Sequence, residues 1–197
     1  MILFVDTATT GLWNWKADNL DPAQPHLLRL AVLRQGDNGE RANYCCLVKP
    51  PDGVEIEEGA TQIHKITRAM AATARADASE ALDVIMLALQ SDNRIIAHNA
   101  DYHRKVLESS LTRAGLPIPP DWKPRWYCTM RHSADIVRVR LQGNGQWKWP
   151  TMAEAHQHFA GPGDWAETDD AWLAGTSYVA AVKRIYDGIQ GSTGRAA

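Results

Sequence analysis

The chain has 197 residues, of which 45% are hydrophobic and 22% are charged, proportions that predict one globular domain with a buried core. Its formal charge of −2 provides no overall field that would attract a polyanion, so a nucleic-acid site has to be a local patch or a metal site. No apolar run reaches the roughly 18 residues of a membrane span. Without a basic lead or a cleavage site for a secretory signal, we expect a cytoplasmic protein that does not bind membranes.

Three short apolar segments predict three consecutive strands near the start of the chain. The first covers residues 2–6, and the next two cover 27–33 and 44–48. The turn sequence Gly-Asp-Asn-Gly at 36–39 joins the second strand to the third and is typical of a hairpin. Residues 13–25 are polar and contain prolines, which indicates a loop between the first two strands. The three strands are therefore expected to form a meander.

Helices and strands alternate in the rest of the chain. Apolar residues in 78–89 recur at spacings of three and four, as in an amphipathic helix. Strands separated by helices pair in parallel, so the two later strands extend the meander as parallel neighbours. We therefore predict an α/β fold with a mixed five-stranded sheet flanked by helices, a single domain over 1–190 and a flexible tail over 191–197. The remaining predicted elements are strands at 94–97 and 126–129 and helices at 101–114, 152–159 and 170–189.

Four motifs follow one another along these elements. They read Asp6-Thr7-Ala8-Thr9-Thr10-Gly11-Leu12, His64-Lys65-Ile66-Thr67, His98-Asn99-Ala100-Asp101-Tyr102-His103 and Asp169-Asp170-Ala171-Trp172-Leu173-Ala174. In order and content they resemble the motifs of the DEDD-type (DEDDh) 3′–5′ exonucleases, which are Asp-x-Glu-Thr-Thr-Gly-Leu, His-Gly-Ile-Thr, His-Asn-Ala-x-Phe-Asp and His-Asp-Ala-x-x-Asp. The resemblance covers nearly the whole chain and implies a ribonuclease-H-like exonuclease fold.

The resemblance also implies a catalytic site, and the residues of this chain depart from it. In the family, carboxylates hold two divalent ions roughly 3.5–4 Å apart, and a histidine outside the metal shell acts as the general base. Only the first acid, Asp6, is kept. The other four positions hold Ala8 for glutamate, His103 for aspartate, Asp169 for the base histidine and Ala174 for the last aspartate. We therefore expect no cofactor or one weakly bound Mg²⁺ or Mn²⁺ at Asp6, and lost or strongly reduced phosphodiester hydrolysis.

A second group of residues is implied to contact the end of a nucleic acid. In the family, the Thr-Gly-Leu turn touches the terminal nucleotide, and its glycine permits the close approach. By the same resemblance, His64 lies near the 3′ nucleotide, although a histidine on a loop is also typical of a capping residue. Asn99 alternatively holds the turn from strand to helix through side-chain hydrogen bonds. Together, the nucleic-acid-binding residues that the resemblance implies are Thr10, Gly11, Leu12, His64, Asn99 and Tyr102.

Three functions remain open from the sequence. The first is a catalytically degenerate protein that binds a single-stranded nucleic-acid end, or another protein, in the former active-site cleft. The second is a working nuclease with a rearranged site of Asp6, His103 and Asp169, a carboxylate and imidazole set that suits manganese, iron or zinc. The third is an interaction scaffold that uses the tryptophan-rich loop 13–25. One predicted helix and its end also carry basic residues that face either phosphates or solvent, namely Arg131, Arg138 and Arg140.

Overall fold

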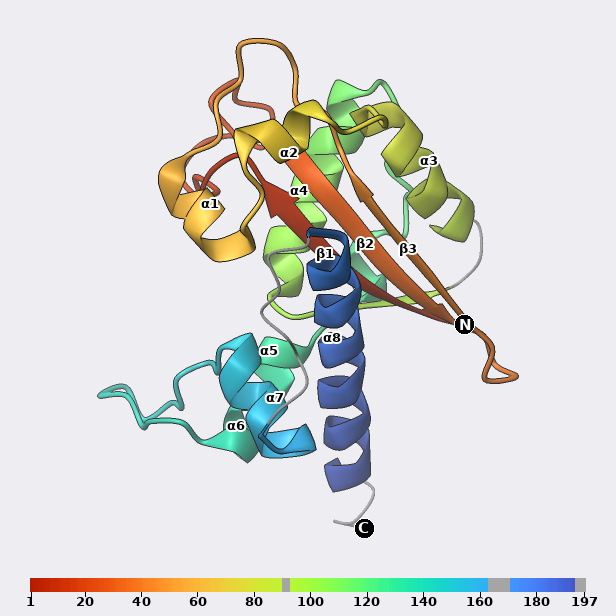
Figure 1. Cartoon of the computed structure of the whole chain (residues 1–197). Helices are drawn as coiled ribbons and strands as arrows, with labels where there is room; N and C mark the ends of the chain where they lie inside the picture. Colours follow the sequence, from red (N-terminus) through yellow and green to blue (C-terminus); the bar gives the residue numbers. More distant parts are fainter. Residues whose placement is uncertain (90–92, 163–170, 194–197) are drawn as a thin grey trace.

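The computed structural model describes residues 1–89, 93–162 and 171–193, and its centre is a mixed five-stranded sheet (Figure 1). The strand order is β3-β2-β1-β4-β5, with β1 antiparallel to β2 and parallel to β4. This order confirms the predicted meander of three strands and the two parallel strands added to it. The strands are β1 (Ile2–Thr9), β2 (Leu27–Gln35), β3 (Arg41–Leu47), β4 (Arg94–Ala97) and β5 (Trp126–Cys128).

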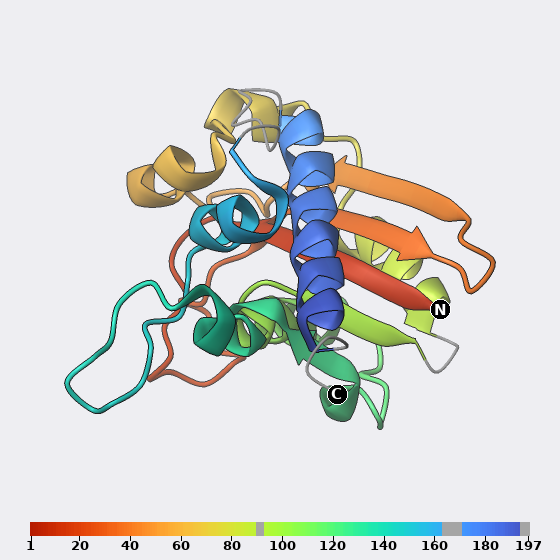
Figure 2. The same cartoon turned by 90° about the horizontal axis from the view of Figure 1, so that it is seen from below.

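Successive residues of β1 point to opposite faces of the sheet, and helices cover both faces. Leu3 packs with apolar residues of α3 (Ala78–Leu89) and α4 (Ala100–Arg113), whereas Phe4 packs with residues of α8 (Ala171–Thr193). Figure 1 shows α8 crossing in front of the sheet with α3 and α4 behind it, and Figure 2 shows the same arrangement from below. The alternation decides which side chains of β1 can meet α8 and which can meet α4.

Several short helices lie outside the elements that the sequence predicted, because a helix of four to seven residues is too short to show a periodic pattern. One consequence is that the prediction for the three arginines is wrong. Arg131 lies in α5, Arg138 ends α6 with a φ of 50°, and Arg140 lies beyond it, so they do not share a helix. The remaining helices are α1 (Glu58–His64), α2 (Arg68–Ala72), the 3₁₀ turn η1 (Lys123–Arg125), α5 (Thr129–His132), α6 (Ala134–Val137) and α7 (Met152–Ala160).

Several boundaries differ from the expected ones by one to four residues, and two of these differences concern the first motif and the predicted tail. Strand β1 continues past residue 6 to Thr9, because residues 7–9 go on pairing with β2. Helix α8 ends at Thr193, three residues into the predicted tail, and residues 194–197 lie outside the described part of the chain. None of the described helices is long and apolar enough to cross a membrane.

Candidate nucleic-acid site

A cavity opens where β1 and β4 separate. Their pairing ends at Phe4 and Ile96, after which β1 runs on and the chain leaves β4 for α4. Crevices at the carboxyl ends of neighbouring parallel strands are the usual ligand sites of α/β sheets. The cavity measures about 570 Å³, a volume typical of sites for small organic ligands. The lining has two parts. We call the buried charged and imidazole side chains the floor, and the exposed apolar side chains Leu12, Trp15 and Ile63 the rim.

The charged residues of the floor are Asp6 and Arg29, which form a buried ion pair. Register places Arg29 of β2 opposite Ala8, so its side chain shares the face of Asp6 and Ala8 that α8 covers. One guanidinium nitrogen of Arg29, Nη2, donates to Oδ2 of Asp6 at 2.9 Å, and the ring of Tyr178 in α8 lies 5.5 Å from the guanidinium carbon. Arg29 is 2% exposed and Asp6 is 7% exposed. The carboxylate that the family uses for metal is therefore held by a fixed cation.

His103 lies beside this pair and connects β1 to the start of α4. Its Nδ1 accepts the backbone N–H of Thr7 at 3.1 Å, which places the ring proton on Nε2, and Nε2 donates to the carbonyl of His98 at 3.0 Å. Nε2 also lies 3.9 Å from Oδ1 of Asp6. Burial lowers the pKa of His103, so the imidazole is neutral at pH 7. Both ring nitrogens are engaged in contacts with the protein.

Two further imidazoles of the cavity wall hold chain segments together. His64 accepts a backbone N–H two residues on through Nδ1 and donates from Nε2 to the carbonyl of Thr9 at 3.1 Å. His98 contacts the hydroxyl of Thr129 at 3.1 Å and donates from Nε2 to the carbonyl of Pro150 at 3.0 Å. Burial lowers the pKa of both rings, that of His98 to about 4. These histidines therefore serve as neutral structural links in this geometry.

The Thr-Gly-Leu turn is fixed from below by a chain of hydroxyl groups. Tyr102 donates to Oγ1 of Thr9 at 2.7 Å, and Thr9 donates to the carbonyl of Gly11 at 2.8 Å. Burial raises the pKa of Tyr102 to about 12, which keeps it a donor. Thr10 is buried and bonds to the backbone just before β2, so it supports the turn without lining the cavity. Leu12 lies on the rim with 68% of its surface exposed.

For two of the remaining predicted residues, the structure shows a local reason for the residue type. Asn99 begins α4 in the left-handed conformation, with φ at 67° and no side-chain capping bond, so the predicted side-chain hydrogen bonding is wrong. Asparagine tolerates this conformation, and that tolerance accounts for the residue here. A Cβ on Gly11 would collide with the carboxylate of Glu57, which accepts the backbone N–H of Leu12 at 3.3 Å. Gly11 therefore makes room for an acidic side chain of this same chain.

The last motif is only partly visible. Ala174 is buried in α8 and does not line the cavity, whereas Asp169 lies outside the described residues. Among the residues that the structure does describe, no three His, Cys, Asp or Glu side chains come together in a group that could hold a metal ion.

Arg29 and Glu57 are the site residues that sequence reasoning missed. Arg29 did leave a signal, because it is a lone charge inside the otherwise apolar run Leu-Leu-Arg-Leu-Ala-Val-Leu. A charge in a buried strand requires a partner, and the first motif supplied one. Glu57 left no comparable signal, since its contact with the turn depends on the path of the loop that precedes α1.

Comparison with known proteins gave matches only among solved structures. No family model and no curated protein sequence matches the chain. Exonuclease I of E. coli, in complex with a dT13 oligonucleotide, superposes with a TM-score of 0.69 at 16% identity over 98% of this chain. This chain spans 42% of the length of Exonuclease I.

Two smaller nucleases match over nearly their whole length. Exonuclease X, in complex with 5′ overhanging duplex DNA, gives a TM-score of 0.58 at 22% identity over 98% of this chain and 93% of its own. The nuclease domain of 3′hExo, a DEDDh family member bound to rAMP, gives 0.67 at 11% identity over 97% of this chain and 92% of its own. The chain therefore has the ribonuclease-H-like fold of the DEDDh exonucleases.

The two divalent ions that this fold implies do not fit the residues that the structure describes around the cavity. Mg²⁺ and Mn²⁺ require several carboxylate oxygens, and the described floor offers the single carboxylate of Asp6, which already accepts the Arg29 guanidinium. Ala8 contributes a methyl group where a second carboxylate would be needed. A divalent ion at Asp6 would also lie close to the guanidinium and be repelled by its charge.

Proposed function

We propose that the chain binds the 3′ end of a single-stranded nucleic acid in this cavity, with phosphodiester hydrolysis lost or strongly reduced. The observation that carries the proposal is the buried ion pair of Arg29 with Asp6, 2.9 Å apart, in the lining of the cavity. It places a guanidinium in the wall of the cavity and engages the one family carboxylate that the chain retains, which disfavours metal binding there. Solved proteins with this fold hold an oligonucleotide or rAMP, which supports a ligand of that class.

The rim of the cavity supports the same ligand. Leu12, Trp15 and Ile63 are each more than half exposed although they are apolar, and all three line the opening. The ammonium group of Lys105 lies 5.9 Å from the centre of the Trp15 ring. Aromatic and apolar surfaces next to a cation bind unpaired bases by stacking and their phosphates by charge. A nucleotide is therefore a chemically suitable occupant.

Binding without metal provides the test. A fluorescent single strand with a free 3′ hydroxyl is titrated by anisotropy in EDTA against the parent chain, Leu12→Ala and Leu20→Ala. Leu20 is the matched control because it is an exposed leucine of the same loop that does not line the cavity. We expect Leu12→Ala to weaken binding about fivefold, which corresponds to roughly 1 kcal/mol of lost apolar contact, and Leu20→Ala to have no effect. Absence of binding to the parent, or equal effects of the two substitutions, would overturn the proposal.

A second candidate is a nuclease with a rearranged site. The 3.9 Å separation of His103 and Asp6 favours it, whereas the engagement of both ring nitrogens of His103 argues against it. This candidate predicts release of 3′ nucleotides in the presence of Mn²⁺ that Asp6→Asn abolishes. It also predicts a calorimetric signal for Mn²⁺ binding to the parent chain, and it fails if calorimetry detects none.

A further inference from the structure

We propose that residues 138–149, here called the arginine–tryptophan hairpin, extend the binding surface along a single strand whose 3′ end occupies the cavity. This inference rests on the proposed function and adds to it the path of the strand. Figures 1 and 2 both show the segment projecting from the body of the molecule between α6 and α7. The segment carries a net positive formal charge, whereas the rest of the chain carries a net negative one.

Positive charge is concentrated at this hairpin. Residues 138–149 contain two arginines, one lysine and no aspartate or glutamate, a formal charge of +3, so the rest of the 197-residue chain, whose total is −2, carries −5. Lys148 pairs with Glu154 at 3.0 Å, so Arg138 and Arg140 make up the main part of this charge. The net charge of the protein therefore hides a local basic patch of the kind that a phosphate backbone requires. Arg138 and Arg140 are both exposed within it.

Backbone hydrogen bonds hold the hairpin in a defined shape. Residues 141 and 147 form an antiparallel bridge, and the N–H of Gln142 donates to the carbonyl of Gln146 at 2.8 Å. The N–H of Lys148 donates to the carbonyl of Arg140 at 2.8 Å, and Gly145 supplies the positive φ of 78° at the turn. The projecting side chains are therefore presented from an ordered support.

Two indole rings on the hairpin each lie beneath an arginine. The guanidinium carbon of Arg138 is 5.7 Å from the Trp147 ring centre, and that of Arg131 is 5.0 Å from the Trp149 ring centre. Trp149 remains 51% exposed. An indole with a cation on one side and solvent on another can stack on a base while the guanidinium meets a phosphate. Stacking requires unpaired bases, so this chemistry favours a single strand over a duplex.

Helix α5, which precedes the hairpin, and Pro150, which follows it, are both attached to the cavity wall. Arg131 donates to the carboxylate of Asp101 at 2.5 Å, two residues beyond Asn99 of the cavity lining. At the other end, the carbonyl of Pro150, which follows Trp149, accepts the Nε2 proton of the lining residue His98. A strand that leaves the cavity past the start of α4 therefore meets Trp149 first and the two exposed arginines next.

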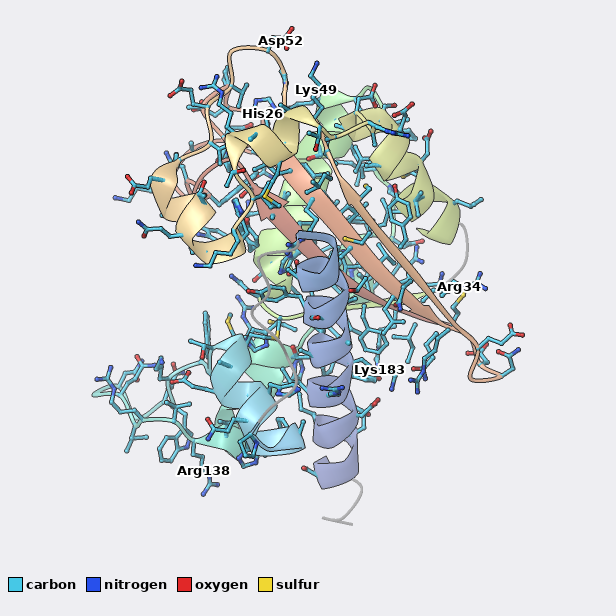
Figure 3. The ribbon with its side chains drawn as sticks, in the orientation of Figure 1. His26, Arg34, Lys49, Asp52, Arg138 and Lys183 are labelled. Atoms are coloured by element: carbon cyan, nitrogen blue, oxygen red, sulfur yellow. The ribbon has the colours of Figure 1, made fainter. Side chains whose placement is uncertain are left out.

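The test compares two ligand lengths in EDTA, so that the cavity and the hairpin are measured separately. A trinucleotide and a 12-nucleotide single strand are titrated by anisotropy against the parent, Trp149→Ala, Trp149→Phe, Arg138→Gln with Arg140→Gln, and Arg34→Gln. Arg34 is the matched control because it is an exposed arginine on the opposite side of the molecule from Arg138 (Figure 3). Circular dichroism checks that each variant is folded.

We expect the parent to bind the longer strand more tightly than the trinucleotide. Trp149→Ala should weaken the longer strand about fivefold and leave the trinucleotide unchanged, with Trp149→Phe close to the parent. Loss of two phosphate contacts in the double variant should lower the salt slope by about 1.4, or about 0.7 for each contact, and Arg34→Gln should not change it.

The outcomes distinguish this inference from the proposed function. If the trinucleotide binds but the longer strand binds no more tightly, the hairpin inference is wrong and the proposed function stands. If the longer strand alone binds and Trp149→Ala weakens it, the hairpin binds single strands without the cavity, which overturns both the cavity proposal and the inference that the hairpin extends it. If neither ligand binds, or if Arg34→Gln acts like the hairpin variants, the hairpin inference is overturned.

Discussion

Arg29 places a positive charge on the buried face of the sheet, where the Asp6 carboxylate and the Tyr178 ring both contact it. The guanidinium is 2% exposed, donates to the Asp6 carboxylate and lies against the Tyr178 ring. A buried ion pair adds little stability over an apolar pair of the same shape, but removal of one partner leaves the other charge uncompensated. Substitution of one member and then of both therefore measures how much the buried pair contributes to stability.

Arg29→Met should destabilise the protein, whereas Asp6→Asn with Arg29→Met should recover most of the loss. We expect the free energy of unfolding to fall by about 3 kcal/mol in the single variant, because Asp6 is left without its cation, and by less than half of that in the double variant. Urea denaturation measures both. Exposed ion pairs contribute about 0–1 kcal/mol. If Arg29→Met lowers the free energy of unfolding by less than about 1 kcal/mol, the pair behaves like an exposed one and the expectation is wrong.

The buried histidines make stability depend on pH in a definite direction. Burial lowers the pKa of His98 from 6.5 to about 4, so between these values the unfolded chain binds a proton that the folded chain does not. Its contribution is therefore complete above pH 6.5 and is lost as the pH falls towards 4, a change of roughly 3 kcal/mol. His64 and His103, whose pKa values burial also lowers, act in the same direction.

Urea midpoints measured between pH 7.5 and pH 4.5 test this expectation. The parent should lose stability steadily below pH 6.5, and His98→Gln, which keeps an N–H donor for Pro150, should lose less over the same interval. His158→Gln is the control, since His158 is exposed on α7. An identical slope in the parent and in His98→Gln would show that His98 does not carry the effect.

At the scale of elements, α8 approaches the sheet closely where Gly175 meets β2 and β3. A Cβ at this glycine would lie 2.6 Å from the sulfur of Cys45 and 3.1 Å from Cδ and Nε of Arg29. The absence of a side chain thus allows α8 to cover the arginine of the ion pair. The close packing of α8 therefore affects the site through Arg29, although Gly175 is not one of the predicted site residues.

Alanine at Gly175 and at Gly191, both in α8, should change stability in opposite directions. Gly175→Ala is expected to cost about 1–2 kcal/mol, because the methyl group overpacks against Cys45 and Arg29. Gly191→Ala should gain about 0.5 kcal/mol from helix propensity, since nothing lies within 4 Å of its added Cβ. Thermal and urea unfolding measure the pair. Equal effects at both positions would contradict the close approach of α8 to β2.

The elements that could be predicted from the sequence were those with a repeating pattern or a strong stop signal. The five strands and helices α3, α4, α7 and α8 were found because apolar runs or helical spacing persist over enough residues. The sequence did not predict four helices, because segments of four to seven residues are too short to show a repeating apolar pattern. These helices are α1, α2, α5 and α6. The arginine–tryptophan hairpin was not predicted either, because its turn is polar and its two sides are joined by a single antiparallel bridge between residues 141 and 147. A single bridge leaves no alternating apolar pattern in the sequence.

At the scale of the whole molecule, motif order was enough to bring distant residues together. The first and third motifs lie more than ninety residues apart, and the structure joins them through Thr7 with His103 and Thr9 with Tyr102. Arg29 could not be placed in the same way. Its contact with Asp6 depends on the register of β1 against β2 and on the space beside α8, which only the assembled sheet defines.

The central claim is the proposal that the chain binds a 3′ end without hydrolysing it, because Arg29 occupies the carboxylate of Asp6. It is tested most directly by measuring release of the 3′ nucleotide from a labelled single strand that is fully bound to the parent chain, with Mn²⁺ or Mg²⁺ added. The account predicts that the strand stays intact and bound with either ion, as it does in EDTA. Release of nucleotides that requires Mn²⁺ or Mg²⁺ and disappears in Asp6→Asn would contradict it.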